Sequence, residues 1–454
     1  MSIVLAVMML VGCGSTSRTS ATSRAQAPAI PDTATGAQAR WLLAASSRLP
    51  IPAAELTRHF TPTFLAKIKP AQINAVLAGA GALLHGDGAV RFASVTADQP
   101  RRLVLTLARG SGPAQLTVSI TVDDHGLISG LLIRPIAAAA KLSSWGAIDE
   151  VVRSVAPHVH MLVADTTDGV CTPIHAIDPA AAAPLGSAFK LYVLNALGEA
   201  VAAGRVSWDQ RLTVTAGVKS LPSGELEAVP DGTRVTVREV ARKMISISDN
   251  TAADMLIELL GRPAIEASLR SAGLGDPGRD IPFLTTRELF ALKLDGWPDL
   301  ATRYAHAGRA ARRALLAGLA GRPLPGTDAI RAWTTPRAID SVEWFASADD
   351  LCRAYVSLSA LARRPGLDPI AGALEVNDGG LGLDPGRWQT TWFKGGSEPG
   401  VLTLTYQATT RTGRSYFVGV LTSDPTSAID EAEAATRLLS AINGAFGLAA
   451  ASGR

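Results

Sequence analysis

The spacing of apolar and polar residues predicts helices followed by strands in the first part of the chain. Apolar residues at helical spacing precede segments in which apolar and polar residues alternate. The expected helices are residues 37–48 and 52–84, and the expected strands are residues 102–108, 114–122 and 127–133. The residues from Asp123 to Gly126, between the last two strands, are typical of a tight hairpin turn. We therefore expect an α+β domain over residues 39–136.

The second part of the chain, residues 141–450, has strand patterns near both ends and helical patterns between them. The expected strands are residues 160–165, 170–177, 388–394, 401–408 and 416–422, and the expected helices begin near residue 141 and cover residues 187–204, 235–261 and 427–446. This order predicts one antiparallel sheet, completed by both terminal segments and packed beside a helical subdomain. Residues 295–340, rich in Gly, Pro and Arg, are the expected insertion.

The N-terminus has the pattern of an export signal. An apolar run over residues 3–12 is too short to span a membrane and ends in Leu10-Val11-Gly12-Cys13. These four residues resemble a bacterial lipobox. The resemblance implies removal of the signal, residues 1–12, and a lipid on Cys13 that anchors the protein to the outside of the cell membrane. Residues 13–38 are rich in Ser, Thr, Ala and Pro and are expected to form a tether.

Composition limits the classes of partner. The chain has 454 residues, with 43 Lys and Arg against 40 Asp and Glu, and no basic run that could follow a phosphate backbone, so we expect no nucleic acid. We expect no metal or cofactor either, because no Cys-x-x-Cys or His-Glu-x-x-His pattern occurs. Of the cysteines, Cys171 and Cys352 are left for one disulfide, which their spacing leaves open. The oligomeric state is also open.

The first candidate motif is Ser187-Ala188-Phe189-Lys190. In a helix this spacing puts the hydroxyl and the amine on one face, within reach of each other. A serine hydroxyl is a weak nucleophile and needs a base, and a lysine can be that base only if its pKa is lowered by burial or by a second cation. A surface pair one turn apart is the alternative.

Two further motifs follow in the chain. Ser248-Asp249-Asn250 offers a second hydroxyl to relay a proton and an amide to orient a substrate carbonyl or the lysine, although the same residues are common at a helix N-cap. Lys394-Gly395-Gly396-Ser397 lies in a strand, where paired glycines indicate a close approach to the backbone. The N–H groups of Ser397 and Ser187 would then stabilise an oxyanion, and Lys394 would face a substrate carboxylate. The alternative is a bulge with a solvated lysine.

The three motifs together resemble those of class A β-lactamases and penicillin-binding proteins. The resemblance covers about residues 145–448 and implies that Ser187 is the nucleophile, Lys190 its base and Ser248 the proton relay. It also implies that Asn250, Lys394, Gly395, Gly396 and Ser397 bind substrate. The first domain resembles the fold of nuclear transport factor 2 (NTF2) and ketosteroid isomerase, with a structural or substrate-gating role. The combination resembles actinobacterial β-lactamase-like lipoproteins and the esterase encoded among clavulanic acid genes.

Two departures from that family modify the expected activity. The third motif lacks the hydroxyl that a Thr at position 395 would provide, and no Glu-x-x-Leu-Asn segment for deacylation is found, because Glu288 and Glu343 have other neighbours. We therefore expect an exported serine hydrolase that acts on esters or β-lactams through an acyl-Ser187 intermediate and is a weak penicillinase or an esterase. A D-Ala carboxypeptidase and a non-catalytic, ligand-binding envelope lipoprotein are the alternatives.

Overall fold

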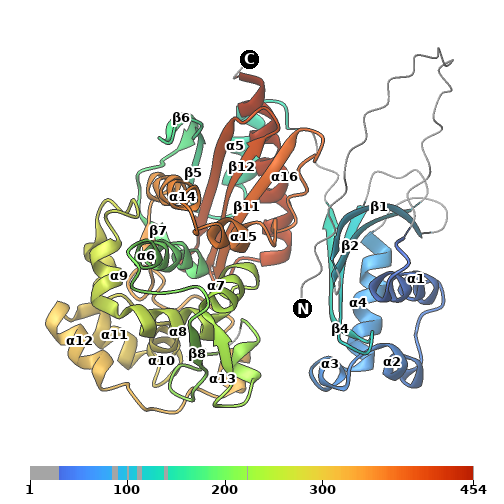
Figure 1. Ribbon diagram of the computed structural model, residues 1–454, viewed down its shortest axis with the longest axis horizontal. Coiled ribbons are helices and arrows are strands. Elements are labelled where there is room, and N and C mark those ends of the chain that lie inside the picture. The colour runs from blue at the N-terminus through green and yellow to red at the C-terminus, as the bar shows by residue number, and fades with distance from the viewer. Residues whose placement is uncertain are drawn as a thin grey trace, which may run out of the picture. The chain divides into compact units, whose positions relative to one another are not determined.

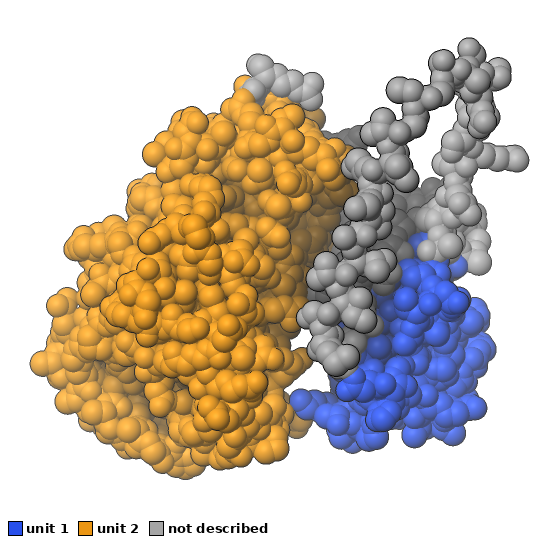
Figure 2. All heavy atoms as spheres, in the orientation of Figure 1, with its two compact units in different colours: residues 1–82, 87–111, 118–133 blue, residues 83–86, 112–117, 134–454 orange. Residues whose placement is uncertain are grey.

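The chain divides into two compact units, which Figure 2 shows in blue and orange. The computed structural model describes residues 30–83, 90–99, 102–109, 115–136, 142–221 and 223–452. Unit 1 comprises residues 1–82, 87–111 and 118–133, and unit 2 comprises residues 83–86, 112–117 and 134–454. The expected signal, Cys13 and most of the expected tether lie outside the described residues. Among the helices of the described ranges, none has the length and apolar character needed to cross a membrane.

Unit 1 has the predicted order of helices followed by strands. Its elements are α1 (Ala34–Ser46), α2 (Ala53–His59), α3 (Pro62–Lys67), α4 (Pro70–Leu83), β1 (Val90–Gln99), β2 (Arg102–Arg109), β3 (Gln115–Val122) and β4 (Ile128–Ile136). The stretch expected as helix 52–84 is divided into three, because a proline stands at or just before the start of each helix. Helix α1 begins within the expected tether, because Thr33 Oγ1 accepts the N–H of Gly36 and caps it.

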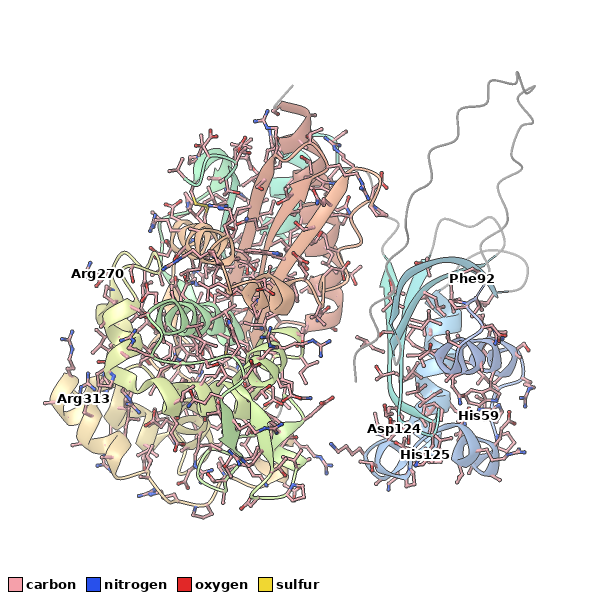
Figure 3. All side chains as sticks on the ribbon, in the orientation of Figure 1. His59, Phe92, Asp124, His125, Arg270 and Arg313 are labelled. Carbon is pink, nitrogen blue, oxygen red and sulfur yellow. A yellow bond between two sulfur atoms is a disulfide. The ribbon has the colours of Figure 1, made fainter. Side chains whose placement is uncertain are left out.

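The sheet of unit 1 has the strand order β1-β2-β3-β4, and its helices lie on one side of it (Figure 1). Apolar side chains at alternating positions, such as Leu103 and Leu105, are buried between the two layers. The predicted turn between β3 and β4 is present: the Asp123 carboxylate accepts the N–H groups of His125 and Leu127, at 2.9 Å each. Figure 3 labels His125 in this turn and also His59, whose ring stacks on Trp41.

Unit 2 is built around a five-stranded antiparallel sheet of order β11-β12-β13-β5-β6. The strands are β5 (His158–Asp165), β6 (Thr172–Ile177), β11 (Trp388–Glu398), β12 (Val401–Thr410) and β13 (Ser415–Ser423). Strand β13 near the C-terminus pairs with β5 near the start of the unit. The predicted α+β class, with one antiparallel sheet completed by both terminal segments, is confirmed.

Both faces of this sheet are covered. Helices α5 (Trp145–Arg153) and α16 (Glu431–Ser452) pack on one face, and α14 (Ala348–Ala362) packs on the other (Figure 1). Strand β5 shows the alternation that this requires, because Met161 and Val163 belong to the core under α5 and α16, whereas Leu162 and Ala164 belong to the core shared with α14. A strand buried on both faces therefore has a continuous apolar sequence.

The helical subdomain occupies the middle of the chain. Its helices are α6 (Lys190–Ala202), α7 (Val237–Ser246), α8 (Asn250–Leu260), α9 (Arg262–Ser268), α10 (Thr286–Leu294), α11 (Asp299–His306), α12 (Arg309–Ala317), α13 (Thr327–Arg331) and α15 (Pro369–Leu374). Three of them, α11, α12 and α13, lie in the expected insertion. The helical stretch expected over residues 235–261 is interrupted at Ser248, whose backbone is left-handed with a φ of 57°.

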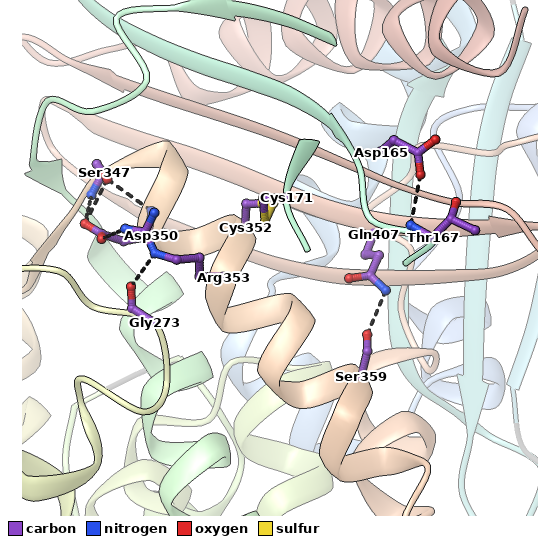
Figure 4. Close-up of a disulfide and its surroundings, with 10 residues drawn as sticks. All are labelled: Asp165, Thr167, Cys171, Gly273, Ser347, Asp350, Cys352, Arg353, Ser359 and Gln407. Atoms are coloured by element: carbon purple, nitrogen blue, oxygen red, sulfur yellow. Dashed lines mark hydrogen bonds and ion pairs between the residues drawn. A yellow bond between two sulfur atoms is a disulfide. The ribbon is translucent and has the colours of Figure 1, made fainter. Parts of the chain in front are cut away.

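A disulfide joins Cys171, just before β6, to Cys352 in α14 (Figure 4). The sequence separation is 181 residues, and Cys352 is fully buried. The disulfide therefore links the edge of the sheet to the helix that separates the sheet from the helical subdomain.

Candidate active site

Ser187 lies in a tight turn against the third motif. The turn is the 3₁₀ helix η1 (Gly186–Phe189), which enters α6 after a left-handed Gly186 with a φ of 50°. A Cβ on Gly396 of β11 would lie 2.1 Å from the carbonyl oxygen of Leu185 and 2.5 Å from the nitrogen of Ser187. The glycine in the strand thus permits a close backbone approach, and what approaches is the turn that carries Ser187.

Lys190 is fully buried and has four polar contacts at its amine. Its Nζ lies 3.0 Å from Ser187 Oγ and 3.1 Å from Ser248 Oγ. It also lies 2.6 Å from the Ser248 carbonyl oxygen and 2.6 Å from Asn250 Oδ1. The structure therefore brings Ser187, Lys190, Ser248 and Asn250 together around one nitrogen.

Full burial favours the neutral form of this amine. A neutral amine has two hydrogens and one lone pair, and the two closest neighbours, the Ser248 carbonyl and Asn250 Oδ1, can only accept hydrogen bonds. In the neutral form, its one lone pair can accept the proton of one serine hydroxyl. Burial, with the charge of Lys394 as the next contribution, holds the pKa of Lys190 well below its usual range, although Asp249 and Asp254 oppose the shift.

The loop before α8 places Ser248 between two lysines. Asp249, and not Ser248, is the N-cap of α8, where its Oδ1 accepts the N–H of Ala252. Its other oxygen accepts the N–H groups of Glu225 and Leu226, at 2.7 and 2.9 Å. Held in this way, Ser248 Oγ lies 3.1 Å from the Nζ of Lys394 as well as 3.1 Å from that of Lys190.

Asn250 was expected to orient a substrate carbonyl or the lysine, and its contacts favour the lysine. Its Oδ1 accepts from Lys190, and its Nδ2 donates to the Leu221 carbonyl at 3.1 Å. The amide is therefore engaged at both ends, so that it orients the amine of Lys190.

Lys394 is buried in β11, so the alternative of a solvated lysine in a bulge is wrong. Burial lowers the pKa of Lys394 to about 7. Next to it, a Cβ on Gly395 would lie 2.8 Å from the Phe393 ring. Ser397 is exposed, and its nitrogen lies 2.8 Å from where a Cβ on Gly186 would be. The backbone nitrogens of Ser187 and Ser397 thus lie on the two sides of one close contact.

Several residues near the site were not singled out by the sequence. Asp254 lies one turn after Asn250 in α8 and accepts the backbone N–H groups of Thr286 and Arg287, at 2.7 and 2.9 Å. Burial raises the pKa of Asp254 to about 7. Its spacing of four residues from Asn250 is a signal that could have placed it on the same helix face.

The two glutamates considered from the sequence have different surroundings. Glu288 caps α10 through the N–H of Thr285 and pairs with Arg262, so both of its oxygens are used. Glu343 is buried beside the turn that carries Ser187, and its Oε2 accepts the N–H of Gly186 at 3.1 Å. No local sequence pattern indicated this contact, which spans 157 residues.

In the comparisons with known proteins, one family model matches within each part of the chain. Residues 145–292 match the model of the β-lactamase enzyme family, and residues 30–128 match the model described as ORF 12 gene product N-terminal. The expected resemblance to the β-lactamase family is therefore confirmed, and unit 2 has the fold of this family of serine hydrolases. A comparison with curated proteins gives no match.

Solved structures similar to the chain include two β-lactamases and a penicillin-binding protein. The β-lactamase from Sphaerobacter thermophilus has 20% identity over 67% of this chain and 96% of that chain, with a TM-score of 0.47. The β-lactamase from Chitinophaga pinensis has 17% identity over 67% and 98%, with a TM-score of 0.46. A mutant of PBP-A, described as an acyl-enzyme complex with penicillin G, has 16% identity over 66% and 96%, with a TM-score of 0.45.

Proposed function

We propose that the protein is a serine hydrolase that acts on esters or β-lactams through a covalent acyl-Ser187 intermediate. The observation that carries this proposal is the contact of 3.0 Å between Ser187 Oγ and Lys190 Nζ, together with the full burial of that amine, which favours its neutral form. A neutral amine beside the hydroxyl is the base that a serine nucleophile requires.

The proposed reaction begins with attack by Ser187 and uses Lys190 as the base. Ser187 Oγ attacks the carbonyl carbon while its proton passes to the lone pair of Lys190. The backbone N–H groups of Ser187 and Ser397 stabilise the oxyanion of the tetrahedral intermediate. When the bond to the leaving group breaks, the proton moves from Lys190 through Ser248 Oγ, 3.1 Å away, to the leaving atom. Water then adds to the acyl carbon, its proton goes to Ser187 Oγ as the bond to that oxygen breaks, and the acid is released.

Substrate preference is proposed from the charges and from the deacylation step. Protonated Lys394 would bind a substrate carboxylate, as in cephalosporin-like rings. Glu288 is fully engaged in a cap and an ion pair, which leaves it unavailable as a base for the deacylating water. A stable penicilloyl group should therefore persist on Ser187, whereas a less hindered ester should turn over. This favours an esterase that is also a weak penicillinase.

The test compares a chromogenic cephalosporin, nitrocefin, with a short-chain ester, using the wild type, Ser187→Ala and the surface variant Ser271→Ala. We expect turnover of the ester in the wild type and Ser271→Ala, loss by at least about a thousandfold in Ser187→Ala, and labelling of Ser187 by a fluorophosphonate. A folded wild type that is not labelled would favour a non-catalytic envelope protein. Release of D-alanine from a stem peptide with no ester turnover would favour a carboxypeptidase.

We also propose that the protein is exported and anchored by a lipid on Cys13. The Cys171–Cys352 disulfide supports export, because structural disulfides are typical of oxidising compartments. Metabolic labelling with a palmitate analogue should mark the wild type and not Cys13→Ser. A labelled Cys13→Ser variant would contradict the anchor.

We further propose an NTF2-like fold for unit 1, with a structural or substrate-gating role. Four helices that pack on one side of a four-stranded sheet support this proposal. An experimental structure in which this sheet does not curve around a cone-shaped interior would contradict it.

A further inference from the structure

A buried group of two carboxyls and one lysine lies behind the turn that carries Ser187. We call Glu343, Glu398 and Lys293 the carboxylate cluster. Glu343 precedes the short strand β10 (Phe345–Ala346), Glu398 ends β11, and Lys293 lies in α10. Lys293 is fully buried, and the side chain of Glu398 is 6% exposed. Residues from three distant segments therefore meet in the interior, where charge is costly.

Each carboxyl holds the chain next to one of the two proposed oxyanion donors. Glu343 Oε2 accepts the N–H of Gly186, the residue before Ser187, at 3.1 Å. Glu398 directly follows Ser397 and forms an ion pair with Lys293. The cluster thus holds the two backbone segments, the turn of Ser187 and the end of β11, whose N–H groups are expected to point at the oxyanion.

The charges of the cluster do not balance if both carboxyls are ionised. Two carboxylates face one ammonium, and a buried charge without a partner costs several kcal/mol. Burial and the neighbouring Glu398 raise the pKa of Glu343 well above its usual range, and Lys293 opposes the shift only in part. Burial also raises the pKa of Glu398, but the ion pair with Lys293 lowers it. Because Glu398 forms the ion pair with Lys293, Glu343 is the carboxyl to which we assign the extra proton.

The oxygens left over agree with a retained proton. Within the described residues, Glu343 Oε1 and Glu398 Oε2 are buried and have no hydrogen-bond partner. Because no donor reaches Glu343 Oε1, a negative charge on that buried carboxyl would be poorly stabilised, which favours its neutral form. The nearby Arg337 guanidinium donates to the Lys293 backbone carbonyl at 2.9 Å and forms no ion pair with either carboxyl among the described residues.

We propose that Glu343 is a positioning residue, which in its protonated form fixes the turn of Ser187 and keeps a negative charge away from the oxyanion. This proposal rests on the proposed function. A neutral carboxyl can accept the Gly186 N–H without opposing charge that develops on the substrate oxygen, whereas an ionised carboxyl would oppose it. Glu343 touches no reacting atom and acts through the backbone.

The test is the pH dependence of ester hydrolysis in the wild type, Glu343→Gln and Glu343→Leu. The wild type should lose kcat at alkaline pH as Glu343 loses its proton. Glu343→Gln keeps a neutral acceptor, so it should retain kcat within about threefold and lose this alkaline decline. Glu343→Leu removes the acceptor and should lower kcat by about ten- to a hundredfold with KM little changed. The control Glu288→Gln should keep the alkaline decline.

An infrared difference spectrum between the wild type and Glu343→Gln gives a readout that does not depend on activity. It should show the carbonyl band of a protonated carboxyl at neutral pH. Absence of this band, or a loss of kcat in folded Glu343→Gln as large as in Glu343→Leu, would overturn the proposal. If the wild type is not labelled at Ser187 but shows the band, the proposed function fails while the protonated Glu343 remains.

Discussion

Two buried clusters of ionisable groups lie on the two sides of the turn that carries Ser187, one built from amines and the other mainly from carboxyls. The lysine cluster, Lys190 and Lys394 with Ser248 between them, has two amines within hydrogen-bond distance of one hydroxyl. The carboxylate cluster has two carboxyls and a single cation. Burial acts on both, but it removes a proton from an amine and retains a proton on a carboxyl.

The difference shows how one physical effect supplies two catalytic requirements. A second positive charge beside a buried lysine keeps the base neutral and able to accept a proton. A second negative charge beside a buried glutamate keeps that glutamate neutral, so no anion lies behind the oxyanion. In each cluster an excess of like charge adds to the cost of desolvation and favours the neutral form.

The largest loss of activity is expected when the lysine cluster loses its base, in Lys190→Met. Methionine fills the volume of the lysine stem but has no basic nitrogen, so kcat/KM for the ester should fall by about a thousandfold or more. Steady-state kinetics on protein that is folded by circular dichroism gives the measurement. Lys243→Met is the matched control, because Lys243 is a surface lysine paired with Glu225. Equal activity in both variants would contradict the role of Lys190.

The second prediction concerns Gly396, where β11 meets the turn of Ser187 between the two clusters. In Gly396→Ala the new methyl would meet backbone atoms 2.1 to 2.7 Å away, which must move and displace Ser187. We expect kcat to fall by about a hundredfold. In Gly372→Ala the methyl meets nothing within 4 Å, so kcat should be unchanged. Similar kcat values for the two variants would show that the close approach is unimportant.

The third prediction separates the two lysines of the lysine cluster by pH. The pKa of Lys394 is about 7, so its charge is present below pH 7 and is lost above it. KM for a substrate with a free carboxylate should therefore rise about tenfold between pH 6 and pH 8. KM for a neutral ester should not change. A parallel rise for both substrates would place the titrating group elsewhere.

The smallest effect on catalysis is expected for the disulfide, which touches neither cluster. The double variant Cys171→Ala/Cys352→Ala should lower the free energy of unfolding by about 3 kcal/mol and leave the pH profile of kcat unchanged. Thermal unfolding with and without a reductant gives the measurement. Reductant should lower the Tm of the wild type and not that of the double variant. A changed pH profile would mean that the disulfide positions one of the clusters.

Local patterns in the sequence were enough to predict most helices and strands. Apolar spacing indicated the order of helices and strands, and prolines at positions 52, 62 and 70 account for the helix starts that periodicity alone did not separate. The pair Ser187 and Lys190 was found because one helical turn fixes their distance. The paired glycines at 395 and 396 indicated that backbone approaches this strand.

Which distant side chains meet, and which of them are protonated, follows from the packing of the folded chain. Glu343 reaches Gly186 across 157 residues, and Lys293 reaches Glu398 across 105 residues. No short pattern records such contacts, because they depend on how the sheet, α10 and the segment before β10 pack. Desolvation likewise depends on the atoms that surround a group, and it sets both the neutral base and the neutral acid. The sequence therefore gives the residue types of the two clusters, whereas burial determines which of their amines and carboxyls are charged.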